Sequence, residues 1–599
     1  MRHGPLEKCL AVLSVLVLAA TGLWAAGEEE GSTAAAADKK YVTDPTTGRV
    51  VVAPEYGGTL TAYAGPGLTQ ASTDPYHGWP SFTGGVSEGL GIMNWGVDRD
   101  VWDLKTLHTP DEHIIGQLAE SWEISPDRLT YTFHIRPGVR WHDKAPMNGR
   151  QFTAHDVEYN FHRLLGMGDF AEAGPSAFSG ALELKSLPWE SITATDDATV
   201  VMKLTEPRLA MLRKAVGLDL GVTFMMPPEV IEQHGDGKDW RNLVGTGPFM
   251  LTDLVEESSI TFTKNPDYWG FDEKYPDNRL PYVDELRYVI IPDAAATYAA
   301  LRSRTIDFKR WDTSLDAAES MRKTNPEIAV HEVFFRSVAS FAPNHREPPF
   351  NDVNVLRAMQ MALDNETIAR TLWKGVADPT PQGLIGVQGF YNPFEEWDEE
   401  VKQYYRYDPE RAEKLLDEAG YPRGADGTRF TTTLNYGAWA DLDYSHIAAA
   451  YWAEIGVVVE IDELSSAEYH ERLFARSGKG MYSQIARNNF DPFNAVSWYH
   501  SNAQWNRGGS QWPELDAMVD AALSAPTPEE ARRLIAEADE YAMSRHWLIW
   551  GPMSPIHFYL QPWIVGYNGE LDGGLGWGKG NDMYARLWID SALKTEMGF

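Results

Sequence analysis

The sequence predicts an α/β protein with more than one domain. Its 599 residues exceed what a single hydrophobic core normally organises, and this length corresponds to roughly two to four domains. Hydrophobic residues form 43% and charged residues 23% of the chain, which is typical of globular proteins and argues against a disordered or fibrous chain. Segments with the two-residue period of strands alternate with segments that have the period of helices.

The best-defined local structure is a strand followed by a helix. Apolar and polar side chains alternate over residues 129–135, as in a half-buried strand, and proline-containing turns stand on both sides of it. Thr153 is expected to cap the helix, with Asp156 placed three residues later as in a capping box. The apolar stripe of this helix is expected to consist of Val157, Phe161, Leu164 and Leu165.

The remaining elements are predicted from periodicity, caps and turn residues. Around residues 334–349 apolar residues give way to Asn, Arg and Pro, and a crossover between domains is expected there, with crossover strands near 333–341 and 550–555 forming a hinge. Strands are expected at residues 57–63, 191–204 (a hairpin), 456–463 and, as apolar pieces, 549–567; helices are expected at 294–302, 354–363, 408–419, 447–455, 514–523 and 529–543.

The N-terminus has the features of an export signal. Arg2 and Lys8 precede an apolar run at residues 10–18 and a group of small residues, so residues 1–27 are predicted to be a cleaved secretory signal peptide. An uncleaved membrane anchor is the alternative. Residues 28–44 are expected to be a disordered leader. No later segment has 18 uninterrupted apolar residues, so no transmembrane domain is expected.

The net charge and the absence of several motifs argue against a number of partners and catalytic sites. The 52 basic and 86 acidic residues give a net charge of −34 and a pI near 4.8, which argues against nucleic acid or anionic lipid as a partner and favours a monomer. Cys9 is the only cysteine, so the chain after it can form no disulfide and no thiolate metal site. The sequence has no HExxH, paired CxxC or GxSxG motif. Residues 573–579 nearly spell a phosphate loop, but Gly580 stands where Ser or Thr is required.

No catalytic residue, metal site or cofactor is therefore predicted, and the protein is not expected to be an enzyme. Carboxylates are abundant, so a secreted hydrolase with an unmarked carboxylate pair is the alternative from another class.

Several motifs resemble one family of binding proteins. The segments LAESWEIS, LTYTFHIRPGVRWHD and FTAHDVEYNF, within residues 118–161, resemble the signature of family 5 solute-binding proteins. These are the extracytoplasmic receptors of ATP-driven peptide importers and their oligosaccharide- and nickel-binding relatives. Further matches to family motifs are GGTL, GTGPF, NPDYW, the segment that ends in IDF, and residues 350–369 and 408–422. The resemblance covers nearly the whole chain after the leader.

The resemblance implies a two-lobed periplasmic-binding-protein fold, of type II and cluster C, with an extra inserted domain and with the ligand enclosed between the lobes. Many relatives carry a lipid-modified cysteine after the apolar run, whereas Cys9 precedes that run, so a protein without a lipid is expected. The expected boundaries are residues 45–87, 189–340 and 550–599 for a discontinuous lobe I, 88–188 for the inserted domain and 341–549 for lobe II.

The candidate ligand site is residues 484–494 and the aromatic residues that flank them. In peptide-binding members of the family, a similar place before an Asp-Pro turn carries an aspartate that pairs with the α-ammonium of the ligand. Such a pairing is physically sound because a buried ammonium needs a charged, hydrogen-bonded partner. Here these places hold one Arg and two Asn, which suit a hydroxyl-rich or anionic ligand about as well as a peptide.

Each candidate residue also has a structural alternative. Asp491 is expected to cap the Asp-Pro turn rather than to contact the ligand, and each aromatic residue is as well explained by a place in the core. His557 and Tyr559 lie on a segment that resembles the returning strand, whose aromatic residues border the cleft in relatives. The candidate ligand-binding residues are Trp439, Arg487, Asn488, Asn489, Asp491, Trp498, Tyr499, Trp505, His557 and Tyr559.

The function implied by the resemblance is that of a periplasmic or otherwise extracytoplasmic receptor. It would capture a peptide-like solute between two lobes and deliver it to an ABC permease in the membrane. A receptor for oligosaccharides or opine-like conjugates on the same fold is the alternative.

Overall fold

The computed structural model describes residues 40–65, 68, 72–78, 83–106, 108–178, 184–218, 223–437, 440–486, 491–571 and 580–599. Within these ranges, no helix is both long and apolar enough to cross a membrane. The described residues form one sheet of ten strands, one of four strands and three of two strands.

The ten-stranded sheet is mixed and joins segments that are far apart in the sequence. Strand β12 runs parallel to β3, with Glu285 opposite Thr59, and β13 pairs with both β3 and β18. From one edge to the other, the strands are β10 (Phe249–Val255), β11 (Ser259–Lys264), β12 (Glu285–Ile290), β3 (Thr59–Ala64), β13 (Phe308–Asp312), β18 (Ile549–Leu560), β14 (Ala329–Pro343), β17 (Met481–Ala486), β15 (Phe430–Gly437) and β16 (Val457–Leu464).

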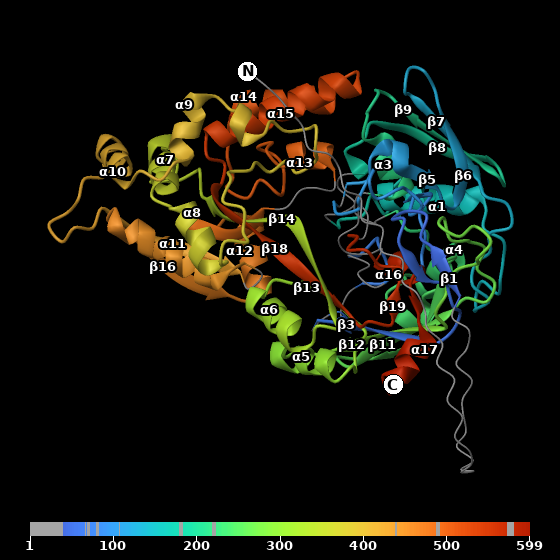
Figure 1. Cartoon of the computed structure of the whole chain (residues 1–599). Coiled ribbons are helices and arrows are strands. Elements are labelled where there is room, and N and C mark those ends of the chain that lie inside the picture. Colours follow the sequence, from blue (N-terminus) through green and yellow to red (C-terminus); the bar gives the residue numbers. More distant parts are fainter. Residues whose placement is uncertain are drawn as a thin grey trace, which may run out of the picture. The chain divides into compact units, whose positions relative to one another are not determined.

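The two long strands β14 and β18 lie side by side in the middle of this sheet and connect its two sides (Figure 1). They are the crossover strands expected near residues 333–341 and 550–555. Their antiparallel register is interrupted, because the pair Val333–Ile556 is followed by the pair Ser337–Ser554. Three residues of β14 therefore stand opposite one residue of β18, which is a bulge in the middle of the connection. We call the side with β3 and β10–β13 lobe I, and the side with β15–β17 lobe II.

A separate antiparallel sheet of four strands contains the best-defined segment of the sequence. Its order is β6 (Ala119–Ile124), β7 (Thr130–Ile135), β9 (Thr199–Leu204), β8 (Trp189–Asp196), which confirms the predicted strand and hairpin. Strands β8 and β9, which follow residue 188, pair with each other and with β7 in this sheet.

Three helices pack their apolar side chains against this sheet. They are α1 (Ala154–Leu165), α3 (Met211–Val216) and α4 (Pro228–His234), which bury Phe161, Met211 and Val230 in one cluster with strand residues such as Phe133. We call the sheet and these helices the inserted domain.

Local capping explains where several helices begin. Thr153 and Asp156 form the expected capping box at the start of α1, and Val157, Phe161 and Leu164 are buried as predicted. Helix α11 begins at Leu442, five residues before the predicted start, because the side chain of Asp441 accepts a hydrogen bond from the backbone N–H of Tyr444.

The other predicted helices are confirmed within a few residues. The complete set of remaining helices of the described residues is α5 (Ala294–Arg302), α6 (Leu315–Thr324), α7 (Val353–Met361), α8 (Asn365–Leu372), α9 (Glu399–Lys402), α10 (Pro409–Glu418), α11 (Leu442–Glu454), α12 (Ser466–Ala475), α13 (Pro492–Ser497), α14 (Pro513–Leu523), α15 (Pro528–Ser544), α16 (Gly580–Tyr584) and α17 (Ser591–Glu596). The two-stranded sheets pair β1 (Tyr41–Thr43) with β2 (Val50–Val52), β4 (Gly91–Met93) with β5 (Ile114–Gly116), and β19 (Ile564–Val565) with β20 (Trp588–Ile589).

Candidate functional site

The candidate residues fall into three groups. Trp439, Arg487, Asn488 and Asn489 lie outside the described residues, so their role stays a prediction. Asp491, Trp498, Tyr499 and Trp505 lie at α13 and the loop after it, in lobe II. His557 and Tyr559 lie on β18, beyond its bulge toward lobe I.

Asp491 caps α13, as the sequence predicts. Its Oδ1 accepts a hydrogen bond of 2.9 Å from the backbone N–H of Phe493, and its side chain has no exposed surface. Among the described residues, Oδ2 accepts no hydrogen bond. The cap therefore uses one oxygen of the buried carboxylate and leaves the other without a donor.

A cation from the inserted domain faces this carboxylate. The Nζ atom of Lys214, in α3, lies 4.0 Å from Oδ2 of Asp491, and only 9% of the Lys214 side chain is exposed. Figure 1 shows α3 and α13 facing each other where the inserted domain meets lobe II. The sequence prediction missed Lys214, and its only signal is a pair of cations, Arg213 and Lys214, inside an apolar segment.

Apolar contacts accompany this ion pair. Ala210, at the start of α3, is buried in a cluster whose other members all belong to residues 338–553, and Leu209 packs against the same cluster. The ring of His108 also lies edge-on to Phe390 of lobe II, with 6.4 Å between the ring centres. Residues 209–214, at α3 and just before it, and His108 are thus in contact with lobe II.

Two tryptophans form a stack next to α13. The rings of Trp498 and Trp505 are nearly parallel, with centres 5.5 Å apart, and the Arg507 guanidinium lies 5.1 Å from the centre of the Trp498 ring. Trp505 is half-buried, whereas Trp498 is 8% exposed. Among the described residues, the Trp498 Nε1–H donates no hydrogen bond. The stack therefore offers an aromatic surface and an indole donor that is still available.

Tyr499 points into lobe II rather than toward the inserted domain. Its hydroxyl donates a hydrogen bond to Asp539 of α15, and its ring lies edge-on to Trp547, with centres 4.9 Å apart. Burial and the neighbouring carboxylate raise the pKa of this hydroxyl well above its ordinary value.

His557 and Tyr559 are part of a buried polar network in lobe I. Neither residue has exposed surface. The Tyr559 hydroxyl donates to Asp312, which also accepts a hydrogen bond of 2.8 Å from Tyr298 and lies 3.2 Å from Nζ of Lys309. The Nε2 atom of His557 lies 3.4 Å from a Glu332 oxygen, and burial lowers the pKa of His557. These contacts lie within β13, β14, β18 and α5.

A second buried carboxylate, Glu88, connects segments that are far apart in the sequence. Glu88 accepts hydrogen bonds from Gln117 Nε2 at 3.1 Å, from the Tyr268 hydroxyl at 2.9 Å and from Trp269 Nε1 at 3.1 Å. Burial raises the pKa of Glu88 to about 7, and the nearby carboxylate of Asp582 adds to the rise. No local signal in the sequence marks this site, because its donors come from distant segments.

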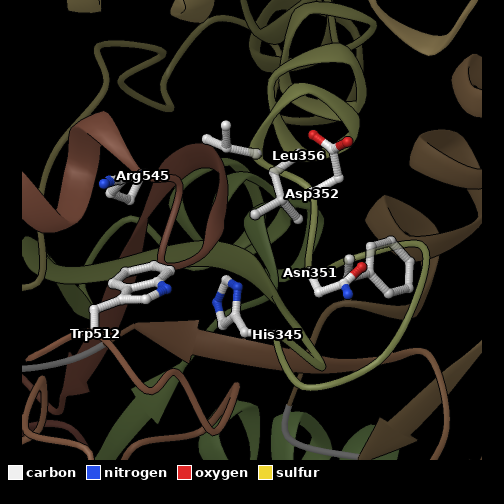
Figure 2. Close-up of a pocket in the computed structure, with 8 residues that line it drawn as sticks. His345, Asn351, Asp352, Leu356, Trp512 and Arg545 are labelled. Carbon is white, nitrogen blue, oxygen red and sulfur yellow. The ribbon is translucent and has the colours of Figure 1, made fainter. Parts of the chain in front are cut away.

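A pocket with a volume of about 400 Å³ lies elsewhere in lobe II. Figure 2 shows Arg545 and Trp512 on one side of it, Asp352 and Asn351 on the other, and His345 between the two sides. Asp352 caps α7 through the backbone N–H of Asn354, and Arg545 donates to the Tyr541 hydroxyl, so both charges are engaged within lobe II. None of the described candidate residues lines this pocket. Nor do the described residues contain a group of three or more His, Cys, Asp or Glu side chains arranged to hold a metal ion.

Comparisons with known proteins agree with the fold and with the motifs. Residues 113–507 match the model of the bacterial extracellular solute-binding proteins, family 5 Middle. Heme-binding protein A of Haemophilus influenzae is 28% identical over 475 residues, which are 74% of this chain and 81% of that protein. The dipeptide-binding protein of Escherichia coli is 28% identical over 415 residues, which are 67% of this chain and 73% of that protein.

A solved structure gives the same result for the fold. The ABC transporter-associated periplasmic binding protein DppA from Helicobacter pylori, in complex with the peptide STSA, matches with a TM-score of 0.70 and 22% sequence identity. The match covers 90% of this chain and 99% of that chain.

Proposed function

Because the chain belongs to the bacterial extracellular solute-binding proteins of family 5 and has their two-lobed α/β fold, we propose that it is the receptor of an ABC importer. It captures a peptide-like solute between its lobes and presents the solute to a membrane permease. The carrying observation is the match of fold over 90% of the chain to a periplasmic binding protein in complex with a peptide. The name of the E. coli relative, a dipeptide-binding protein, supports the same class of ligand.

The geometry at α13 is consistent with recognition of a polar solute. Asp491 Oδ2 and Trp498 Nε1 are a buried acceptor and a buried donor that find no hydrogen-bond partner among the described residues. Buried polar groups are normally hydrogen-bonded, so such atoms are suited to pair with a ligand. We place the ligand against these two atoms and the half-buried ring of Trp505, together with the predicted contacts of Arg487, Asn488 and Asn489.

His557 and Tyr559 have a different place in this proposal. Their side chains are buried in the network around Asp312, at the lobe I end of the connection between the lobes. They position β18 and act on the ligand through it.

The location follows from the same proposal. The protein acts outside the cytoplasm, after export by the signal peptide of residues 1–27, and meets its permease at the membrane as a monomer. Its task is the binding of a solute, in keeping with a family description that names solute-binding proteins.

A ligand screen by thermal shift tests this function. A ligand at a hundredfold excess over its dissociation constant stabilises the folded protein by about 2.7 kcal/mol. For a folded part of this size, that corresponds to a rise in melting temperature of about 2 °C. Di- to pentapeptides are screened beside cello-, manno- and galacto-oligosaccharides. Peptides should give the rise; a rise with oligosaccharides alone would establish the alternative ligand class, and no rise with either would overturn the proposal.

A further inference from the structure

At the contact between α3 and α13, the charge of Asp491 is balanced but its hydrogen bonding is incomplete. Lys214 Nζ lies 4.0 Å from Asp491 Oδ2, which is close enough for an ion pair but too long for a hydrogen bond. Among the described residues no donor reaches Oδ2. The side chains are 0% and 9% exposed, so water screens this pair far less than it screens an ion pair at the surface.

This combination of a balanced charge and an unfilled hydrogen bond determines which chemical group of a ligand can bind at Oδ2 of Asp491. A ligand ammonium at Oδ2 would bring a second positive charge next to Lys214 in a buried site, and like charges in such a site disfavour each other. A neutral N–H or O–H would complete the hydrogen bonding of Oδ2 without adding a charge.

The neighbouring cation, Arg213, has other partners. Its Nη1 donates to the Thr109 carbonyl and lies 3.1 Å from Asp111 Oδ1.

We propose that Lys214 is a specificity-determining residue of the binding site. It supplies the cation for Asp491, so the ligand group received at Oδ2 is a neutral donor, such as the amide N–H of a peptide whose amino end is blocked or lies elsewhere. This inference rests on the proposed function and names a property of its ligand. It also makes the ion pair a contact between the inserted domain and lobe II that forms when these two parts meet.

Matched peptide mixtures test the inference. A random tripeptide mixture and the same mixture with acetylated N-termini are incubated with the full-length exported protein, and the retained peptides are quantified by native mass spectrometry. Wild type should retain the acetylated mixture at least as well as the free one. Lys214→Met removes the protein's own cation, so a ligand ammonium can replace it at Asp491. The ratio of free to acetylated peptide should then rise about tenfold, the gain of a charge-assisted over a neutral hydrogen bond.

Lys203→Met is the matched control. Lys203 is an exposed lysine on β9 of the same domain, so its removal makes the same change in net charge at a distance from Asp491. The ratio of free to acetylated peptide that Lys203→Met retains should equal that of wild type. The inference is overturned if wild type prefers free amines by about tenfold or more, or if Lys214→Met binds peptides with an unchanged ratio.

A double-mutant cycle on the unliganded protein separates this inference from the proposed function. Asn retains the capping ability of Asp491 but removes its charge. Lys214→Met and Asp491→Asn should each lower the melting temperature, because each removes one half of a buried ion pair, and the double variant should regain more than half of the loss. If no peptide binds wild type, the proposed function fails, and this cycle alone decides whether Lys214 is the partner of Asp491. Additive losses would overturn the pairing and with it the inference.

Discussion

Glu88→Gln is expected to change how the free energy of unfolding depends on pH. Burial raises the pKa of this carboxyl from 4.5 to about 7. Between these two pH values the folded protein keeps a proton that the unfolded chain has released, so the contribution of Glu88 to stability is lost as the pH rises. Since each pH unit is worth about 1.4 kcal/mol, the contribution reaches about 3 kcal/mol below pH 4.5.

Three buried histidines act in the opposite direction. Burial lowers the pKa values of His142 and His345 to about 4 and that of His546 to about 3. Between these values and 6.5 the unfolded chain binds protons that the folded protein excludes, so stability is lost as the pH falls. The wild-type curve sums these opposing contributions with those of other buried groups, so wild type alone does not isolate the contribution of Glu88.

The difference between wild type and variant isolates the carboxyl. The histidine contributions cancel in this difference, because the histidines are unchanged. Urea unfolding followed by tryptophan fluorescence at pH 5 and pH 7 should show that the free energy by which wild type exceeds Glu88→Gln is about 2 kcal/mol larger at pH 5.

The control is Glu190→Gln, an exposed carboxyl on β8, for which the difference should be the same at both pH values. An equal difference at both pH values for Glu88→Gln as well would mean that Glu88 is already ionised at pH 5, and the reasoning from burial would be refuted.

Three further outcomes are expected from the connection, the tryptophan stack and the N-terminus. Lobe closure should bend β14 and β18 at the bulge between the pairs Val333–Ile556 and Ser337–Ser554. Small-angle scattering should therefore give a smaller radius of gyration with ligand than without it. An identical profile at ligand saturation would contradict this. Trp498→Phe keeps an aromatic ring in the stack but removes the Nε1–H, which donates to no described residue. Calorimetry should therefore show that the affinity for ligand falls about tenfold, while the melting temperature changes little. An unchanged affinity would place the ligand elsewhere. Intact-mass analysis of the exported protein should give a chain that begins near Glu28 without lipid, and a lipid on Cys9 would exclude this prediction.

Local signals made part of the fold predictable. The capping box of Thr153 and Asp156 and the cap formed by Asp491 involve residues only two or three positions apart, so the sequence contains both partners. The same holds for the predicted start of α10, where Asp408 caps through the backbone N–H of Arg411. Helix α11 was predicted too short because its first turn carries no apolar periodicity, and the Asp441 cap was not recognised.

Pairings between distant segments could not be predicted from the sequence. The register of β12 against β3 brings Glu285 opposite Thr59, and nothing within either segment specifies the other. The same holds for β8 and β9, because their strand periodicity does not specify the sheet that they join. Glu88 illustrates this limit for a site, because its three donors come from residues 117, 268 and 269.

The pair Lys214–Asp491 could be predicted from the sequence only in part. Arg213 and Lys214 are adjacent in a short helix, and successive residues of a helix point about 100° apart, so the two side chains leave the helix in different directions. A carboxylate is a favourable partner for a buried lysine, and a capping aspartate can offer one because the cap uses only one of its oxygens. The sequence thus contains a cation inside an apolar helix and a carboxylate whose cap uses one oxygen, but only the fold brings them to 4.0 Å. If the same pair sets the charge that a ligand must not carry, then the specificity of this receptor depends on how its inserted domain meets lobe II as much as on the candidate residues that precede Asp491.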